Sequence, residues 1–166
     1  MQEIVTDLVF SDNHRRFKVP ASIVEQLRQF AQVEKSQPEA GGILLGRLLL
    51  NTTDVVVDEI TTPQPTDQCS RFMFRRLGQG HQQILDDRWK QSGGTCNYLG
   101  EWHTHPEPEP RPSGRDIRSW RDQVKLSPPD RQELYFVIVG TMALSVWRAN
   151  RNPFHYYQLQ LISTIR

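Results

Sequence analysis

Residues 103–116 read HTHPEPEPRPSGRD and constrain the fold of this chain more than any other segment. Four of the seven residues at 106–112 are proline, which lacks a backbone donor and fixes φ. These prolines exclude a helix or a central strand, so we expect a strand up to His105 and then a stiff loop. Ser113 is a preferred residue at helix N-caps. It predicts a helix over residues 114–124.

The same segment carries residue types that bind metal ions. His103 and His105 lie two positions apart in an extended segment, so their side chains point to one face, about 7 Å apart along the backbone. Ser113 and Asp116 lie three positions apart on one face of the expected helix. Two imidazoles and a carboxylate are three of the four ligands of a tetrahedral zinc ion, and the fourth position holds water in hydrolytic sites. Taken alone, Ser113 is only a helix cap and Asp116 only a residue that favours the helix dipole, but neither structural role excludes the functional one.

A hydrolytic site also needs a carboxylate that accepts a proton from the water and returns it to the leaving amine. Two glutamates are candidates. Glu101 lies two residues before His103 on the same strand face, and Glu39 precedes the glycine-bounded stretch GGILLG at 41–46. Sequence spacing does not choose between them.

The remaining pattern predicts an α/β domain with a curved, mixed or mostly antiparallel sheet flanked by helices. Residues 40–50 are nearly continuously apolar, which is typical of a strand covered on both faces. In the first helix Ile23 and Leu27 predict a buried stripe, whereas Gln32 is expected to face solvent. Residues 61–70 contain two prolines and are expected to form a loop. Strands are expected at 4–10 and 17–19 as a hairpin, at 40–50 and 55–60 as a second hairpin, and at 72–74, 98–105, 134–141, 144–148 and 156–162, with helices at 20–35, 80–91 and 114–124.

Composition excludes several classes of function. The net charge is +1 with acids and bases interspersed, which gives no electrostatic case for nucleic acid or an anionic membrane surface. The longest apolar run, GGILLGRLLL, contains Arg47 and is too short to span a bilayer. The start, MQEIVTDLVF, does not resemble a signal peptide, and two cysteines outside any CxxC motif fit a reducing compartment. We expect a soluble cytoplasmic protein of one domain, with no nucleic-acid or membrane partner.

Several other side chains have simpler structural interpretations. Cys96 has no accompanying thiol-protease arrangement, so a buried structural thiol is favoured. Trp102 and Trp120 are expected in the core beside the metal site. Three histidines lack ligand spacing and are expected at the surface or in hydrogen bonds: His14, His81 and His155.

Glu39 in EAGGILLG, taken with HTHPEPEPRPSGRD, resembles the JAMM motif, a glutamate followed by His-x-His, seven residues, serine, two residues and aspartate. This motif is the signature of the JAB/MPN-plus zinc metallopeptidases. The resemblance implies a single MPN/JAB (cytidine-deaminase-like) domain over residues 1–166. It implies one catalytic Zn²⁺ on His103, His105 and Asp116.

The family's pattern also implies roles for the other polar residues. Glu39 would be the general acid/base, and Ser113 would stabilise the oxyanion of the tetrahedral intermediate. Glu101 is left with a supporting or solvent-facing role. Residues 72–74 either join the core or, as in relatives, form an edge that pairs with the extended tail of a ubiquitin-like substrate.

Within the family, the chain is most similar to the stand-alone deconjugating peptidases of bacterial anti-phage CBASS operons. This likeness implies a zinc-dependent metallo-isopeptidase that cleaves after the C-terminal tail of a ubiquitin-like or conjugated protein. Its substrate would be a conjugate of the operon's nucleotidyltransferase, the CD-NTase. One alternative is a processing protease for a ubiquitin-like sulfur carrier. Another is a non-catalytic MPN scaffold, although scaffolding relatives have lost ligands that this chain keeps.

Overall fold

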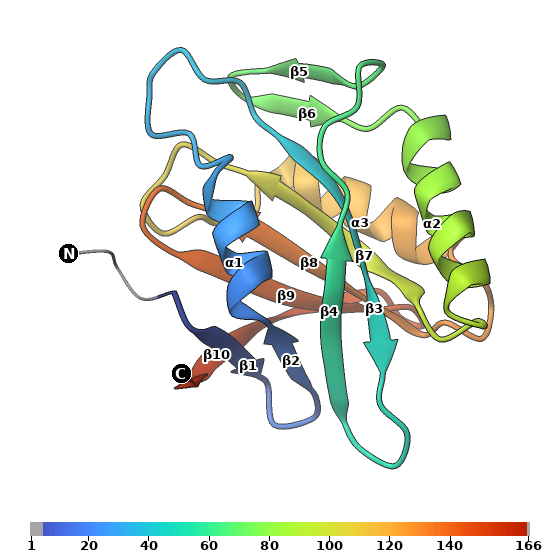
Figure 1. Cartoon of the computed structure of the whole chain (residues 1–166). Coiled ribbons are helices and arrows are strands. Elements are labelled where there is room, and N and C mark those ends of the chain that lie inside the picture. The colour runs from blue at the N-terminus through green and yellow to red at the C-terminus, as the bar shows by residue number, and fades with distance from the viewer. Residues whose placement is uncertain (1–4, 166) are drawn as a thin grey trace.

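The computed structural model describes residues 5–165 and contains a closed eight-stranded barrel with three helices (Figure 1). The barrel order is β1-β10-β9-β8-β7-β3-β4-β2, and β5 and β6 form a separate two-stranded sheet. The pairs β2–β4 and β7–β8 are parallel and the other neighbouring strands are antiparallel. The α/β fold with a curved mixed sheet is therefore confirmed. The strands are β1 Asp7–Ser11, β2 Arg16–Val19, β3 Gly41–Leu48, β4 Asp54–Ile60, β5 Gln68–Ser70, β6 Met73–Arg75, β7 Asn97–Thr104, β8 Glu133–Val139, β9 Leu144–Asn150 and β10 His155–Ile165, and the helices are α1 Ala21–Arg28, α2 Gln79–Gln91 and α3 Gly114–Leu126.

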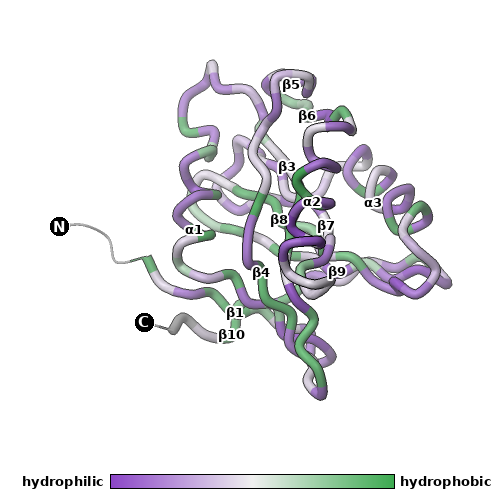
Figure 2. Tube along the Cα trace, turned by 45° about the vertical axis from the view of Figure 1, so that its right-hand side comes forward, coloured by the Kyte–Doolittle hydropathy of each residue, from purple (hydrophilic) through white to green (hydrophobic). Residues whose placement is uncertain are grey.

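Strand alternation divides the apolar side chains between the barrel interior and the helices outside it. On β8, Val137 belongs to the interior cluster that α1 completes, whereas Phe136 belongs to a second cluster with Trp120 of α3. On β3, Leu44 lies inside and Ile43 packs outward toward α2. The prediction of a strand covered on both faces is therefore confirmed up to Gly46, whereas Leu48 and Leu50 are exposed. Figure 2 shows the apolar residues gathered along the strands, while α2 and α3 are largely hydrophilic.

Helix α1 is shorter than the periodicity predicts. It ends at Arg28 rather than near residue 35, and Gln32 is buried rather than exposed to solvent. The carboxamide of Gln32 bonds with Thr104 and with two backbone carbonyls from other segments. These tertiary hydrogen bonds override the local helical pattern, because they are satisfied only when the chain turns inward after the helix.

The segment after β4 contains more structure than the prolines suggest. Residues 68–70 form β5, which pairs with β6, so the expected loop at 61–70 is wrong at its end and the extended piece at 72–74 is confirmed. The two expected hairpins, β1–β2 and β3–β4, are confirmed as well. The first expected strand begins at residue 4, and this residue lies outside the described residues.

A glycine lets other segments approach β3 closely. A Cβ atom on Gly42 would lie 2.1 Å from the carbonyl oxygen of Thr61, so only glycine fits there. This approach lets the hydroxyl of Thr61 accept a hydrogen bond from the backbone of Ile43. Among the described residues, no helix is long and apolar enough to cross a membrane.

Candidate functional site

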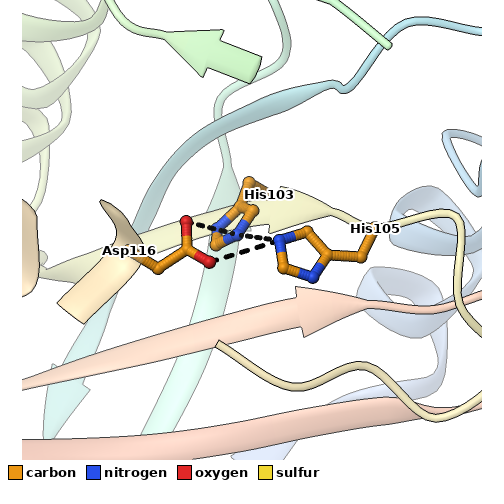
Figure 3. Close-up of side chains that lie close together, drawn as sticks. All are labelled: His103, His105 and Asp116. Carbon is orange, nitrogen blue, oxygen red and sulfur yellow. Dashed lines mark hydrogen bonds and ion pairs between the residues drawn. The ribbon is translucent and has the colours of Figure 1, made fainter. Parts of the chain in front are cut away.

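Strand β7 and helix α3 bring three potential metal ligands together (Figure 3). His103 and His105 project from the same side of the chain at the end of β7, while Thr104 between them is fully buried in the opposite direction. Asp116 lies in the first turn of α3 and faces both imidazoles. The structure thus brings together the three residues that the sequence nominated.

The distances between the donor atoms are close to those of a tetrahedral zinc site. Nε2 of His103 lies 3.1 Å from Nε2 of His105 and 3.3 Å from Oδ1 of Asp116. Nε2 of His105 lies 3.3 Å from Oδ2 of Asp116. Ligands about 2.0–2.1 Å from a tetrahedral zinc are separated by about 3.3 Å. The two Asp116 distances end on different carboxylate oxygens, and one ligand atom from each of the three residues lies within 4.8 Å of the others. The three side chains are therefore close enough together to bind one metal ion.

Asp116 is held in place by the start of its own helix. The Ser113 backbone N–H donates to Oδ2 of Asp116 at 2.6 Å, and the Ser113 hydroxyl oxygen accepts from the Asp116 backbone N–H at 3.2 Å. This capping box confirms the predicted N-cap. Burial raises the pKa of Asp116, but hydrogen bonds from His103 and His105 outweigh it and hold the pKa well below its usual range. The carboxylate is therefore ionised, as a metal ligand must be.

The proline-rich loop between the histidines and α3 is fastened to the turn after β8. The carbonyl of Glu107 accepts from the backbone N–H of Thr141, and the carbonyl of Pro108 accepts from those of Met142 and Ala143. The backbone N–H of His105 donates to the carbonyl of Val139. This stiff connection fixes where α3 begins relative to the histidines.

Glu39 reaches the same site from the other side. Gly41 pairs with His103, and Thr104 N–H donates to the carbonyl of Ala40, so continuing this antiparallel register places Glu39 opposite His105. Burial raises the pKa of Glu39, although the two nearby histidines oppose the shift. Glu39, His103, His105, Ser113 and Asp116 line one cleft of about 920 Å³.

Glu101 lies in the same cleft but is already paired. Its Oε1 lies 2.6 Å from Nη2 of Arg76, and both side chains are about four-fifths buried. Within residues 5–165 no lysine, arginine or histidine forms such an ion pair with Glu39. The structure therefore gives Glu101 a partner that the sequence did not reveal, and it leaves Glu39 free of a competing cation.

The alternatives for other side chains are largely settled by burial. Trp102 and Trp120 are buried as expected, and Cys96 is a buried free thiol whose pKa is raised by burial. His81 is fully buried and hydrogen-bonded. Phe72 is exposed and Phe74 only half-buried at the cleft, so residues 72–74 do not form part of the core.

Comparisons with known proteins agree with this arrangement. Residues 20–152 match the family described as prokaryotic homologs of the JAB domain. The chain is 38% identical over 135 residues to a Pseudomonas aeruginosa protein named CD-NTase/cGAS isopeptidase, covering 81% of this chain and 84% of that protein. An Escherichia coli protein of the same name is 32% identical over 160 residues, covering 96% and 99%.

Solved structures agree at the level of the fold. The solution structure of a Desulfitobacterium hafniense protein superimposes with a TM-score of 0.58 at 19% identity, covering 94% of this chain and 92% of that one. The matched family segment contains Glu39, both histidines, Ser113 and Asp116. The residues that line the cleft thus all lie within the segment that matches the family.

Proposed function

The chain belongs to the family of prokaryotic JAB-domain homologues, and we propose that it is a zinc-dependent metallo-isopeptidase acting at the cleft between β7, α3 and β3. The observation that carries this proposal is the convergence of His103, His105 and Asp116 at 3.1–3.3 Å beside Glu39. Two imidazoles and a carboxylate leave one position of a tetrahedral zinc open for water, which is the arrangement of hydrolytic sites.

The chain's own residues would then divide the work of peptide hydrolysis. A zinc ion held by the three ligands would supply a water molecule of lowered pKa and polarise the substrate carbonyl. The carboxylate of Glu39, whose pKa is raised by burial, would accept the proton of the water and deliver it to the leaving amine. The Ser113 hydroxyl oxygen accepts from Asp116 N–H, so its own proton is available to the oxyanion.

The relatives indicate the class of substrate. Proteins named CD-NTase/cGAS isopeptidase match this chain over 74–99% of their length. We therefore propose that the substrate is a conjugated protein with an extended C-terminal tail, specifically a CD-NTase conjugate in a bacterial CBASS system. In this proposal residues 1–166 act as one catalytic domain in the cytoplasm.

Substitution of the proposed acid/base tests the mechanism. We expect Glu39→Gln to bind zinc stoichiometrically but to lose about 10²–10⁴-fold in kcat, because the amide cannot accept the proton. Zinc content would be measured by mass spectrometry. Cleavage would be measured on a fusion protein that carries the CD-NTase C-terminus. Glu101→Gln is the matched control and should lose far less. Full activity of Glu39→Gln with zinc bound would contradict the assignment.

The same assay separates the other functions. Preferential trimming of a sulfur-carrier precursor to expose a terminal Gly-Gly would favour a processing protease. Protein purified without stoichiometric zinc and inactive on both substrates would favour a scaffold. Cleavage of the CD-NTase fusion alone is the outcome that we expect.

A further inference from the structure

A buried carboxamide joins three segments that surround the site. The side chain of Gln32 is almost completely buried, and its Nε2 donates to the carbonyls of Gln37 at 3.1 Å and Arg71 at 2.9 Å. Its Oε1 accepts from the hydroxyl of Thr104 at 2.9 Å. Both donor hydrogens and the oxygen of the amide are therefore used, as expected for a polar group so deeply buried.

Thr104 connects Gln32 to the backbone of Ala40, the residue that follows Glu39. Its hydroxyl donates to Gln32 and accepts from the backbone N–H of Ala40 at 3.0 Å, while its own N–H donates to the carbonyl of Ala40. Thr104 lies between His103 and His105, and Ala40 is next to Glu39. One hydroxyl thus links the backbone of the two histidines to the backbone of the glutamate.

The contact with Arg71 fixes the other flank of Glu39. Arg71 lies in the turn between β5 and β6, directly after Ser70 at the end of β5. The Glu39 N–H donates to the carbonyl of Ser70 at 2.7 Å, and Phe74 of β6 lines the same cleft as Glu39. Gln32 therefore holds both the segment before Glu39 and the turn next to Ser70, which bonds to the backbone of Glu39.

The geometry points to Gln32 and Thr104 as positioning residues that hold the Glu39 carboxylate in register with His103 and His105. This inference rests on the function proposed above and adds two residues to it. Neither side chain touches substrate, because Thr104 is fully buried and Gln32 nearly so. Both act through the backbone. A displacement of about 1 Å in a reacting group can cost on the order of 10²-fold in rate.

Substitutions at Thr104 separate hydrogen bonding from packing. Thr104→Val keeps the shape and removes the hydroxyl, whereas Thr104→Ser keeps the hydroxyl and removes the methyl group. We expect Thr104→Val to lose at least about tenfold in kcat, with KM within about twofold and zinc stoichiometric. Thr104→Ser should stay within about threefold of the wild type. A larger loss in Thr104→Ser than in Thr104→Val would show that Thr104 serves only packing and would overturn the inference.

Gln32→Met is a second substitution for the same kinetic test. Its matched control is Gln26→Met, on the exposed face of α1. Gln32→Met should lower kcat as Thr104→Val does, and Gln26→Met should leave it unchanged. Thermal unfolding would establish that each variant is folded before kinetics are compared. If Thr104→Val and Gln32→Met both keep the wild-type kcat, the inference fails.

A measurement without substrate separates this inference from the proposed function. Amide hydrogen exchange of Ala40 should accelerate at least about tenfold in Thr104→Val and Gln32→Met, but not in Thr104→Ser or Gln26→Met. Unchanged exchange in the first two variants would overturn the inference even if the enzyme is active. A wild-type protein that binds zinc but cleaves no conjugate would refute the proposed function, while the exchange result would still test the network.

Discussion

At the scale of single residues, Ser113 combines a structural role with a proposed chemical one. Its hydroxyl caps α3 and lines the cleft. Ser113→Ala removes both the cap and the proposed oxyanion contact, whereas Ser113→Gly removes the hydroxyl at a cap cost of only a few tenths of a kcal/mol. We expect kcat to fall by about 10²–10³-fold in both variants, as for loss of one oxyanion donor. Only Ser113→Ala should lose about 1 kcal/mol of stability.

Urea unfolding measures the stability of the two variants and steady-state kinetics measures their kcat, so together they separate the cap from the oxyanion contact. Ser113→Thr, which keeps a hydroxyl at the cap, is the control and should retain most of both properties. If activity followed the free energy of unfolding, so that Ser113→Gly remained active, Ser113 would be a helix cap alone.

Residue spacing was enough to nominate the three ligands and the cap. It works because the period of a strand and the first turn of a helix fix the direction of side chains within a few residues. Spacing alone did not choose between Glu39 and Glu101, and the resemblance to the JAMM motif favoured Glu39. The ion pair of Glu101 with Arg76 and the register of β3 on β7 are contacts that spacing does not encode, and both agree with that choice. Gln32 was missed because its partners come from segments remote in sequence.

At the scale of elements, a buried cluster fastens the segment that carries β5 and β6. Asp67 accepts from the backbone N–H groups of Gln64 and Leu77 and lies 2.8 Å from Nε2 of His81. Nδ1 of His81 lies 2.6 Å from the hydroxyl of Thr61, which accepts from Ile43 N–H. A neutral His81 that donates through Nε2 and accepts at Nδ1 satisfies every partner. Thr61 is buried, so the cluster is structural rather than a second catalytic triad.

Removal of the imidazole should therefore be costly. His81→Leu leaves the Asp67 carboxylate buried without its side-chain partner, and we expect about 3–5 kcal/mol of destabilisation in urea unfolding. His81→Gln keeps a donor for Asp67 and should lose about 1–2 kcal/mol. Equal stability of both variants would show that the hydrogen bond to Asp67 contributes little.

The elements themselves were largely predictable, and their ends were less so. Apolar periodicity located the long strands and α2 and α3, because each buries one or two continuous faces. Strand β5 escaped detection because its three residues are exposed and depend on pairing with β6. The end of α1 was misplaced because Gln32 satisfies its amide only by leaving the helix.

At the scale of the whole molecule, the barrel closes through strands from the two ends of the chain. Strand β1 pairs with both β2 and β10, and this closure could not be predicted because alternation reveals a buried face but not the neighbouring strand. A buried arginine reinforces the closure. Arg148 of β9 forms ion pairs with Asp12, after β1, and with Glu133 of β8, at 2.7 and 3.1 Å.

The ion pair between Arg148 and Asp12 should make the free energy of unfolding fall at acid pH. Burial raises the pKa of Asp12, but the hydrogen bonds from Arg148 and from the backbone of Arg15 and His14 outweigh it, so the folded pKa lies below the unfolded value of about 3.8. At acid pH the unfolded state therefore binds the proton more tightly than the folded state. The stabilisation is fully present above about pH 4 and is lost as the pH falls through the folded pKa.

Asp12→Asn isolates this contribution, because the asparagine Oδ1 can still accept from the backbone N–H groups of His14 and Arg15. We expect the variant to be about 1.5–3 kcal/mol less stable than the wild type at pH 7, with the difference narrowing as the pH falls below 4. Asp54→Asn, which removes the more exposed pair with Arg16, should cost less than about 1 kcal/mol. Urea unfolding of the three proteins between pH 2.5 and pH 7 measures both effects. A pH-independent difference between Asp12→Asn and the wild type would rule out ionised Asp12 as the source of the stabilisation.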